Sequence, residues 1–244
     1  SNGTLQIGNG GTTGRLGFGP VVNNATLIHK RSDDTSISTA ITGSGRFVQA
    51  GSGVVTFGTA QAYTGQTRID AGSLSLGETG SVAASSAVTV AAGASFIVAD
   101  LLSGAYTVPA TQTLGGDGSV LGAGTVAGGA TLSPGASPGT LTITDNVTLG
   151  SGGNYNWQML SATGSAGSST SWDLLSVGGA LTIASTPADP FKLNLWTLSA
   201  ILPDTSGSAA NFSSGQSYSW KIATAVGGIS GFAANKFCLL YTSP

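Results

Sequence analysis

The residues with the greatest potential for chemistry in this sequence form one short run, His29-Lys30-Arg31-Ser32-Asp33-Asp34. As a site, the run would offer a base, two cations and two carboxylates. Because His29 is the only histidine of the chain, neither a histidine-based zinc site nor a histidine triad would find its partners. Asp side chains in turns hydrogen-bond their own backbone, so we interpret the run as a turn between two strands.

Paired carboxylates could still cleave glycosides, and enzymes are known that cleave polysaccharides on a β-helix. The acidic side chains lie mostly at expected turns and loops: Asp33, Asp34, Asp70, Glu78, Asp100, Asp117, Asp145, Asp173, Asp189 and Asp204. A lyase would also need an Arg or Lys facing calcium-binding acids, whereas the eight cations of this chain are scattered. We therefore predict no catalytic, cofactor-binding or metal-binding residue. Three or more acids gathered in a side groove would favour an enzyme instead.

The elements that must position these residues are β-strands, as the composition indicates. Charged residues make up only 7% of the 244 residues, whereas Gly occurs 39 times and Ser, Thr, Ala and Val dominate the rest, which argues against helices. The net charge of −2 comes without a basic patch, so we expect no nucleic-acid partner. The single cysteine, Cys238, allows no internal disulfide. No apolar run is long enough for a membrane helix and no signal peptide opens the sequence, so an exported protein would be a fragment of a longer precursor.

Short strand-like runs, separated by Gly, Asn, Asp or Ser, recur through the first 150 residues. We expect strands near 25–28, 36–41, 46–49, 54–57, 66–69, 73–76, 87–90, 95–98, 105–108, 119–121, 125–127 and 140–143. An antiparallel sandwich or barrel and a β-helix both fit many short strands. Glycines at strand ends, few hairpin signals and internal repetition favour the β-helix.

The repetition is clearest between Gly3-Thr-Leu-Gln-Ile-Gly8 and Gly72-Ser-Leu-Ser-Leu-Gly77, which lie 69 residues apart. With coils of about 20 residues, this distance would hold about three coils. In such a fold, alternate residues point inward and stack from coil to coil. We expect Leu74, Leu76, Val88 and Val90 in this core.

The composition changes after about residue 150, because all four tryptophans, Trp157, Trp172, Trp196 and Trp220, lie beyond it. Longer strand-like runs appear near 172–177, 180–183, 191–198 and 217–225, and we expect a flexible loop or hairpin tip at 161–171. A solenoid needs its open end covered, so we predict a C-terminal β cap at 151–237 that continues the core. A carbohydrate-binding module in this region would instead need two or more exposed, coplanar tryptophans.

Several phrases resemble the autotransporter-associated β-strand repeat. They are residues 3–17, residues 27–45 and the run AYTGQTRIDAGSLSLG at 62–77, together with the double Pro-Gly loop Ser133-Pro-Gly-Ala-Ser-Pro-Gly139. The loop is similar to one near the end of many autotransporter passenger domains. The resemblance covers residues 1–150 and implies a right-handed, single-stranded parallel β-helix that is exported by a bacterium and displayed at or beyond the outer membrane.

The expectation for the whole chain is a β-helix shaft at 1–150 and a β cap at 151–237. The string at 238–244 resembles a translated sequencing adapter and is expected not to be native, the alternative being a plain terminal strand at 237–241. We expect a secreted or surface-displayed stalk without enzymatic activity or cofactor. It would be a monomer, would contact extracellular glycans or proteins, and would attach to a membrane only through segments outside this sequence. The alternatives are a polysaccharide lyase or glycosidase and a carbohydrate-binding module.

Overall fold

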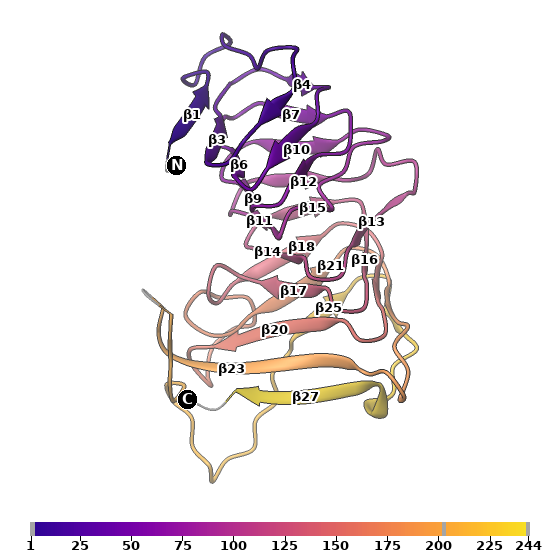
Figure 1. Cartoon of the computed structure of the whole chain (residues 1–244). Coiled ribbons are helices and arrows are strands. Elements are labelled where there is room, and N and C mark those ends of the chain that lie inside the picture. The colour runs from indigo at the N-terminus through magenta and orange to yellow at the C-terminus, as the bar shows by residue number, and fades with distance from the viewer. Residues whose placement is uncertain (1–2, 202–203, 243–244) are drawn as a thin grey trace. The chain divides into compact units, whose positions relative to one another are not determined.

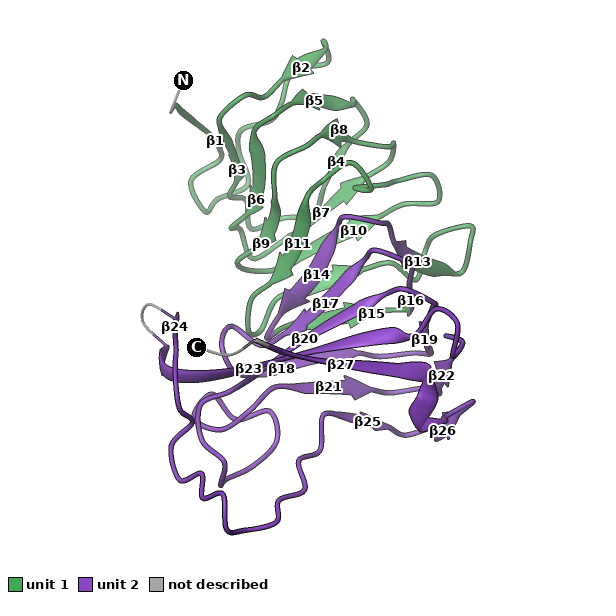
Figure 2. Cartoon of the chain, turned by 60° about the horizontal axis from the view of Figure 1, so that its bottom comes forward, with its two compact units in different colours: residues 1–106, 118–123 green, residues 107–117, 124–244 purple. Residues whose placement is uncertain are grey.

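The computed structural model describes residues 3–201 and 204–242, and nearly all of its regular elements are β-strands (Figure 1). The described residues contain no α-helix and a single 3-10 turn, η1 (Ala234–Lys236). The chain divides into two compact units, residues 1–106 with 118–123 and residues 107–117 with 124–244 (Figure 2). Because the strands of each unit pair in parallel between successive coils, the expected all-β parallel β-helix is confirmed.

The strands up to residue 121 are short. They are β1 (Thr4–Ile7), β2 (Val21–Val22), β3 (Thr26–His29), β4 (Thr35–Ile37), β5 (Ile41–Gly43), β6 (Arg46–Gln49), β7 (Val54–Phe57), β8 (Ala62–Tyr63), β9 (Thr67–Ile69), β10 (Ser73–Leu76), β11 (Ala87–Val90), β12 (Ser95–Ile97), β13 (Ala105–Val108), β14 (Thr113–Gly116) and β15 (Ser119–Leu121).

The later strands include longer ones. They are β16 (Ala123–Val126), β17 (Thr131–Pro134), β18 (Thr140–Ile143), β19 (Val147–Leu149), β20 (Asn154–Met159), β21 (Leu174–Val177), β22 (Leu181–Ile183), β23 (Phe191–Ile201), β24 (Asp204–Ser206), β25 (Ala223–Ala225), β26 (Ile229–Ser230) and β27 (Phe237–Thr242).

Successive strands of the first unit fall on three faces. One face has the order β1-β3-β6-β9-β11, the second β4-β7-β10-β12-β15 and the third β2-β5-β8. Residues 22 or 20 positions apart lie side by side, as Thr4 does with Thr26 and Leu27 with Phe47. This spacing agrees with the coil length expected from the sequence.

The second unit is built in the same way. One face has the order β14-β17-β20-β23 with β27 beside β23, another has β18-β21-β25, and the third has β16-β19-β22-β26. Within the described residues of this unit, β24 pairs antiparallel with the end of β23, and antiparallel contact elsewhere is limited to isolated bridges such as Met159 with Trp172. Residue 150 lies between β19 and β20, and strands on its two sides pair directly, as Leu132 of β17 does with Tyr155 of β20. The division into shaft and cap at this residue stays a prediction.

The core consists of the alternate strand residues that point inward. Leu74, Leu76, Val88 and Val90 are each fully buried, which confirms the inward positions expected from the sequence. Aromatic side chains join them, for example Phe47 and Phe57, whose rings meet edge to face at 4.9 Å. Burying a Val or Leu side chain stabilises a fold by roughly 1.5–3 kcal/mol, so every coil adds to the stability.

The 69-residue repetition does not relate strands of the same face. Its first copy forms β1, on the face with β3, whereas its second copy forms β10, on the face with β7. The position equivalent to β1 three coils later is occupied by β9, whose Thr67 lies beside Phe47. The 69 residues therefore span three complete coils and one further side of a coil. Similar sequences form strands on different faces of the β-helix.

Some strand expectations need correction. The run 36–41 divides into β4 and β5, because the chain turns a corner at 38–40. The run 217–225 forms a strand only in its last three residues, β25. The segment 161–171 is a loop as expected, but Ser161 and Ser171 are buried in it. Strands such as β14 and β20 were not expected, because Gly and Asn obscure their alternation.

The C-terminal residues form a regular strand, β27, which pairs in parallel with β23 so that Phe237 lies beside Phe191. This is the terminal-strand alternative of the sequence analysis. Residues 243–244 lie outside the described residues, and the suspected non-native origin of 238–244 stays a prediction. Cys238 is a free, half-buried thiol. No helix of the described residues has the length and apolar character needed to cross a membrane.

Candidate functional site

His29 ends strand β3 inside the first unit, where only 3% of it is exposed. Its Nδ1 lies 2.8 Å from Gln49 Oε1, and its Nε2 lies 3.0 Å from Thr35 Oγ1. Burial lowers the pKa of the imidazole, although the bond to Gln49 acts in the opposite direction. His29 is thus a neutral hydrogen-bonding link between neighbouring coils.

The rest of the polar run forms the expected turn between β3 and β4. Arg31 binds Asp33 through two bonds, Nε to Oδ1 at 2.9 Å and an amino group to Oδ2 at 2.6 Å. The same guanidinium lowers the pKa of Asp33 and donates to the backbone carbonyls of Thr12 and Gly14. Asp34 reaches beyond its own turn, because its carboxylate accepts from the Val54 N–H of the next coil at 3.0 Å. The polar run therefore anchors a loop and a neighbouring strand.

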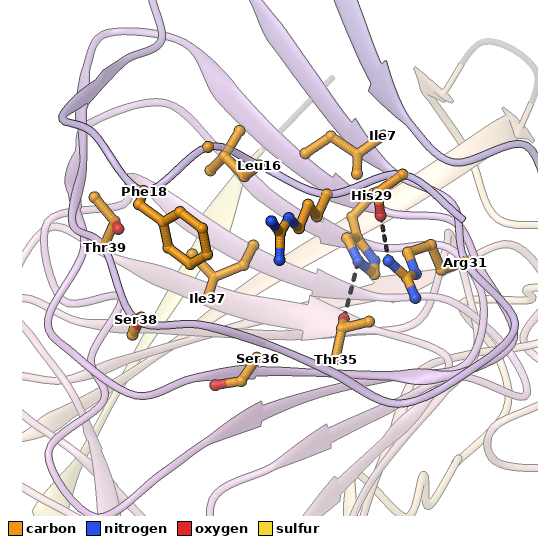
Figure 3. A pocket seen from close by; sticks show the side chains of 13 residues that line it. Ile7, Leu16, Phe18, His29, Arg31, Thr35, Ser36, Ile37, Ser38 and Thr39 are labelled. Atoms are coloured by element: carbon orange, nitrogen blue, oxygen red, sulfur yellow. Dashed lines mark hydrogen bonds between the residues drawn. The ribbon is translucent and has the colours of Figure 1, made fainter. Parts of the chain in front are cut away.

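A pocket of about 160 Å³ opens beside this run, between the segment 14–18 and strand β4 (Figure 3). Leu16 and Ile7 lie on one side of it and Thr35 and Ser36 on the other, and His29 points into it (Figure 3). Arg15 also lines the pocket, and its guanidinium carbon lies 4.7 Å from the centre of the exposed Phe18 ring. The pocket thus combines a cation, hydroxyl groups and apolar surface.

The pocket exists because the described residues of the first coil contribute no strand that pairs with β4 of the second coil. β7 pairs with β4 on one side, but β4 is the last strand of its sheet. Residues 14–18 form no strand and lie across the pocket from β4 (Figure 3). The connection from β1 to β2 spans residues 8–20, whereas β3 and β4 are joined by 30–34. The longer connection bends away and leaves the edge of β4 open.

Aspartates gather at the double Pro-Gly loop in the second unit. Asp117 Oδ1 accepts from the Ala136 N–H at 2.7 Å, and Asp173 Oδ1 accepts from the Gly139 N–H at 2.8 Å. Ser137 donates its hydroxyl to Asp204 Oδ1 at 2.6 Å. The three acids, far apart in sequence, hold one loop in place.

Asp173 is the most perturbed carboxyl group of the cluster. It is fully buried, and its Oδ2 accepts a second backbone bond from the Gln158 N–H at 2.8 Å. Burial raises its pKa to about 7, with the charges of Asp117 and Asp204 adding to the shift. Burial also raises the pKa of Asp117. A substrate has no access to Asp173, whose two oxygens are already engaged with the backbone.

The expectation of scattered acids is therefore only partly met. Asp117, Asp173 and Asp204 come together, and each is used in a hydrogen bond to or from the chain. Across 3–201 and 204–242, no group of three or more His, Cys, Asp or Glu side chains is arranged to hold a metal ion. The loop was evident from its prolines and glycines, but nothing local in the sequence links it to acids 19 to 67 residues away.

The tryptophans do not form an exposed platform. Trp157 and Trp172 are buried, and Trp196 is 37% exposed. Trp220 is half-buried, donates its ring N–H to the Ala162 carbonyl at 3.0 Å and stacks on Tyr218 at 5.1 Å. The condition of two exposed, coplanar tryptophans for a carbohydrate-binding module is not fulfilled.

Comparison with models of known protein families gives no match, and comparison with curated protein sequences gives no significant match.

Sequence reasoning selected His29 and its neighbours but missed Arg15 and Phe18, which also line the pocket. The unusually long stretch between the first two strands, residues 8–20, was the signal that could have indicated them.

Proposed function

We propose that this chain is a structural stalk, secreted or displayed at the cell surface, that holds other modules of an autotransporter-like protein away from the cell. The observation that carries the proposal is the ladder of parallel strands in each unit. Every coil adds backbone hydrogen bonds and a row of buried apolar side chains together, which makes a stiff element from a repetitive sequence.

The polar residues inside the coils support a rigid stalk. Gln49 is fully buried, and its Nε2 donates to the carbonyls of Gly51 and Gly53 at 2.9 Å each while its Oε1 faces His29. Among the residues that the structure describes, no buried side-chain nitrogen or oxygen lacks a hydrogen-bond partner. Satisfied polar groups disfavour local opening, and a protein exposed to external proteases benefits from that.

The outer faces suit weak contacts spread over a large area. Outward strand positions carry small hydroxyl side chains, as at Ser36, Thr42 and Thr89, which are all exposed. We infer that the partners are extracellular glycans or proteins, bound by a monomer through many such contacts. The net charge of −2 disfavours nucleic acid as a partner.

Surface display is tested by fusing the chain to an autotransporter barrel from which the native passenger has been removed. We expect whole bacteria to show the chain to an antibody against an N-terminal tag, and added protease to leave most of the shaft intact. Fusions that stay inside the cell although they are folded would contradict the proposal.

A carbohydrate-active enzyme is the second candidate, favoured only by the gathering of Asp117, Asp173 and Asp204 and by the raised pKa values of Asp117 and Asp173. The test is an assay for new reducing or unsaturated sugar ends on a panel of polysaccharides. We expect none. Product formation that disappears in Asp117→Asn, in a variant that stays folded, would replace the stalk proposal by the enzyme.

A further inference from the structure

The open edge of β4 supplies backbone donors to the pocket. Ile37 directs its carbonyl toward β7, where Gly58 N–H binds it at 3.1 Å. Backbone groups of successive strand residues point to opposite sides, so Ser36, which lines the pocket, turns its N–H toward the open edge. An open strand edge presents unpaired donors and acceptors to any ligand that enters.

The charge of the pocket is positive. Arg15 forms no ion pair with a carboxylate in the part of the chain that the structure describes. The other guanidinium, Arg31, is neutralised by Asp33, and His29 is buried and neutral. None of the described residues that line the pocket is acidic. One uncompensated cation therefore lines the cavity, and it lies over the Phe18 ring.

The size of the pocket limits what it can hold. A cavity of about 150 Å³ accepts a molecule as large as benzene, with about six non-hydrogen atoms. The present pocket has about 160 Å³ and apolar walls at Leu16 and Ile37. A folded domain or an extended peptide would not fit within this volume, whereas a short carbon chain with one charged end would.

We propose that this pocket is a binding site for a small organic carboxylate. The carboxylate accepts hydrogen bonds from the Arg15 guanidinium and from the Ser36 backbone N–H. Its carbon chain lies against Leu16, Ile37 and the Phe18 ring. Guanidinium groups are suited to this task because their planar fork matches the two carboxylate oxygens.

The experiment is a titration of the ¹⁵N-labelled chain with sodium propionate at constant ionic strength, followed by amide chemical shifts. Propionamide has the same shape without the charge and serves as the first control. We expect saturable shifts at Ser36, Ile37 and Phe18 with propionate, and affinity at least tenfold weaker for propionamide. Arg15→Gln should weaken propionate binding at least tenfold and Arg15→Lys by less.

The matched control variant is Arg68→Gln, which removes the same charge from an exposed ion pair with Asp70 outside the pocket and should leave propionate binding unchanged. Equal affinity for propionamide, shifts without saturation, or unchanged binding in Arg15→Gln would overturn the proposal. Sodium sulfate binding as tightly as propionate would also overturn it, since the apolar walls would then contribute nothing. Equal shifts with sodium chloride in place of propionate would show a response to salt alone, with the same consequence.

Discussion

At the scale of single residues, polar side chains in this protein mostly serve the coils. His29 and Gln49 join coils through their side chains, and Asp34 reaches the backbone of the next coil. Reactive residue types therefore need not indicate reactivity, because a hydrogen bond between coils requires the same donors and acceptors as a catalytic site.

The clearest test of the core is Val88→Asp. Val88 is fully buried in β11, so the substitution places an unpaired charge in the core. We expect destabilisation by about 4 kcal/mol or more, measured by thermal or urea unfolding. The neighbouring Thr89→Asp, at an exposed position beside Arg68, is the control and should change stability by at most about 0.5 kcal/mol. Equal stability of the two variants would refute the inward placement of Val88.

The pH dependence of stability tests the buried Asp173. Its pKa rises from 3.8 to about 7 on folding, so between these pH values the unfolded chain has released a proton that the folded chain retains. Asp173 therefore favours folding most below about pH 4, and its contribution to stability falls as the pH rises to about 7, by a total on the order of a few kcal/mol.

Urea unfolding of the wild type and Asp173→Asn at several pH values measures this contribution. The amide introduced by Asp173→Asn would lose one backbone hydrogen bond at every pH, but it does not titrate. We expect the wild-type midpoint to fall relative to that of the variant across the window. Parallel midpoints in the two proteins would show that Asp173 is ionised throughout.

At the scale of elements, the double Pro-Gly loop depends on the absence of side chains. A Cβ atom at Gly139 would overlap Asp117 Oδ1, and one at Gly135 would overlap Asp173 Oδ1. Gly135 also has a φ of +90°, which other residues rarely adopt. The aspartates can therefore approach the loop this closely only because the two positions carry no side chain.

Gly139→Ala should destabilise the second unit by about 1–3 kcal/mol, because either the loop or Asp117 must move. Gly58→Ala is the matched control, since no atom lies within 4 Å of its added Cβ. Differential scanning calorimetry of both variants measures the difference. If Gly139→Ala were as stable as the control, the loop would be able to shift and still keep its hydrogen bonds to Asp117 and Asp173.

At the scale of the whole molecule, we expect local unfolding to begin in the longest connection that contains no strand. It runs through 207–222, between β24 and β25, and includes Phe212, which is 56% exposed. Exposed connections are preferred sites of proteolysis, whereas residues held in parallel ladders are protected.

Limited digestion with a protease of broad specificity should therefore cut first within 207–222. Mass spectrometry of the early fragments identifies the site. In the Val88→Asp variant, we expect early cuts in the first unit as well. First cuts of the wild type within 46–149 would contradict the ladder as the source of resistance.

The sequence by itself determined the local features of this protein. Strands such as β6, β7, β10 and β11 were predicted with their observed bounds, because alternation of apolar and polar residues is a local pattern. The same pattern gave the inward positions, and prolines and glycines gave the corner at 133–139. Only the tertiary structure decided which strands share a face, which acids meet at that corner, and that β4 keeps an open edge beside Arg15. These features depend on contacts between residues about one coil or more apart, and the weak, repetitive strand phrases of this chain do not specify such partners.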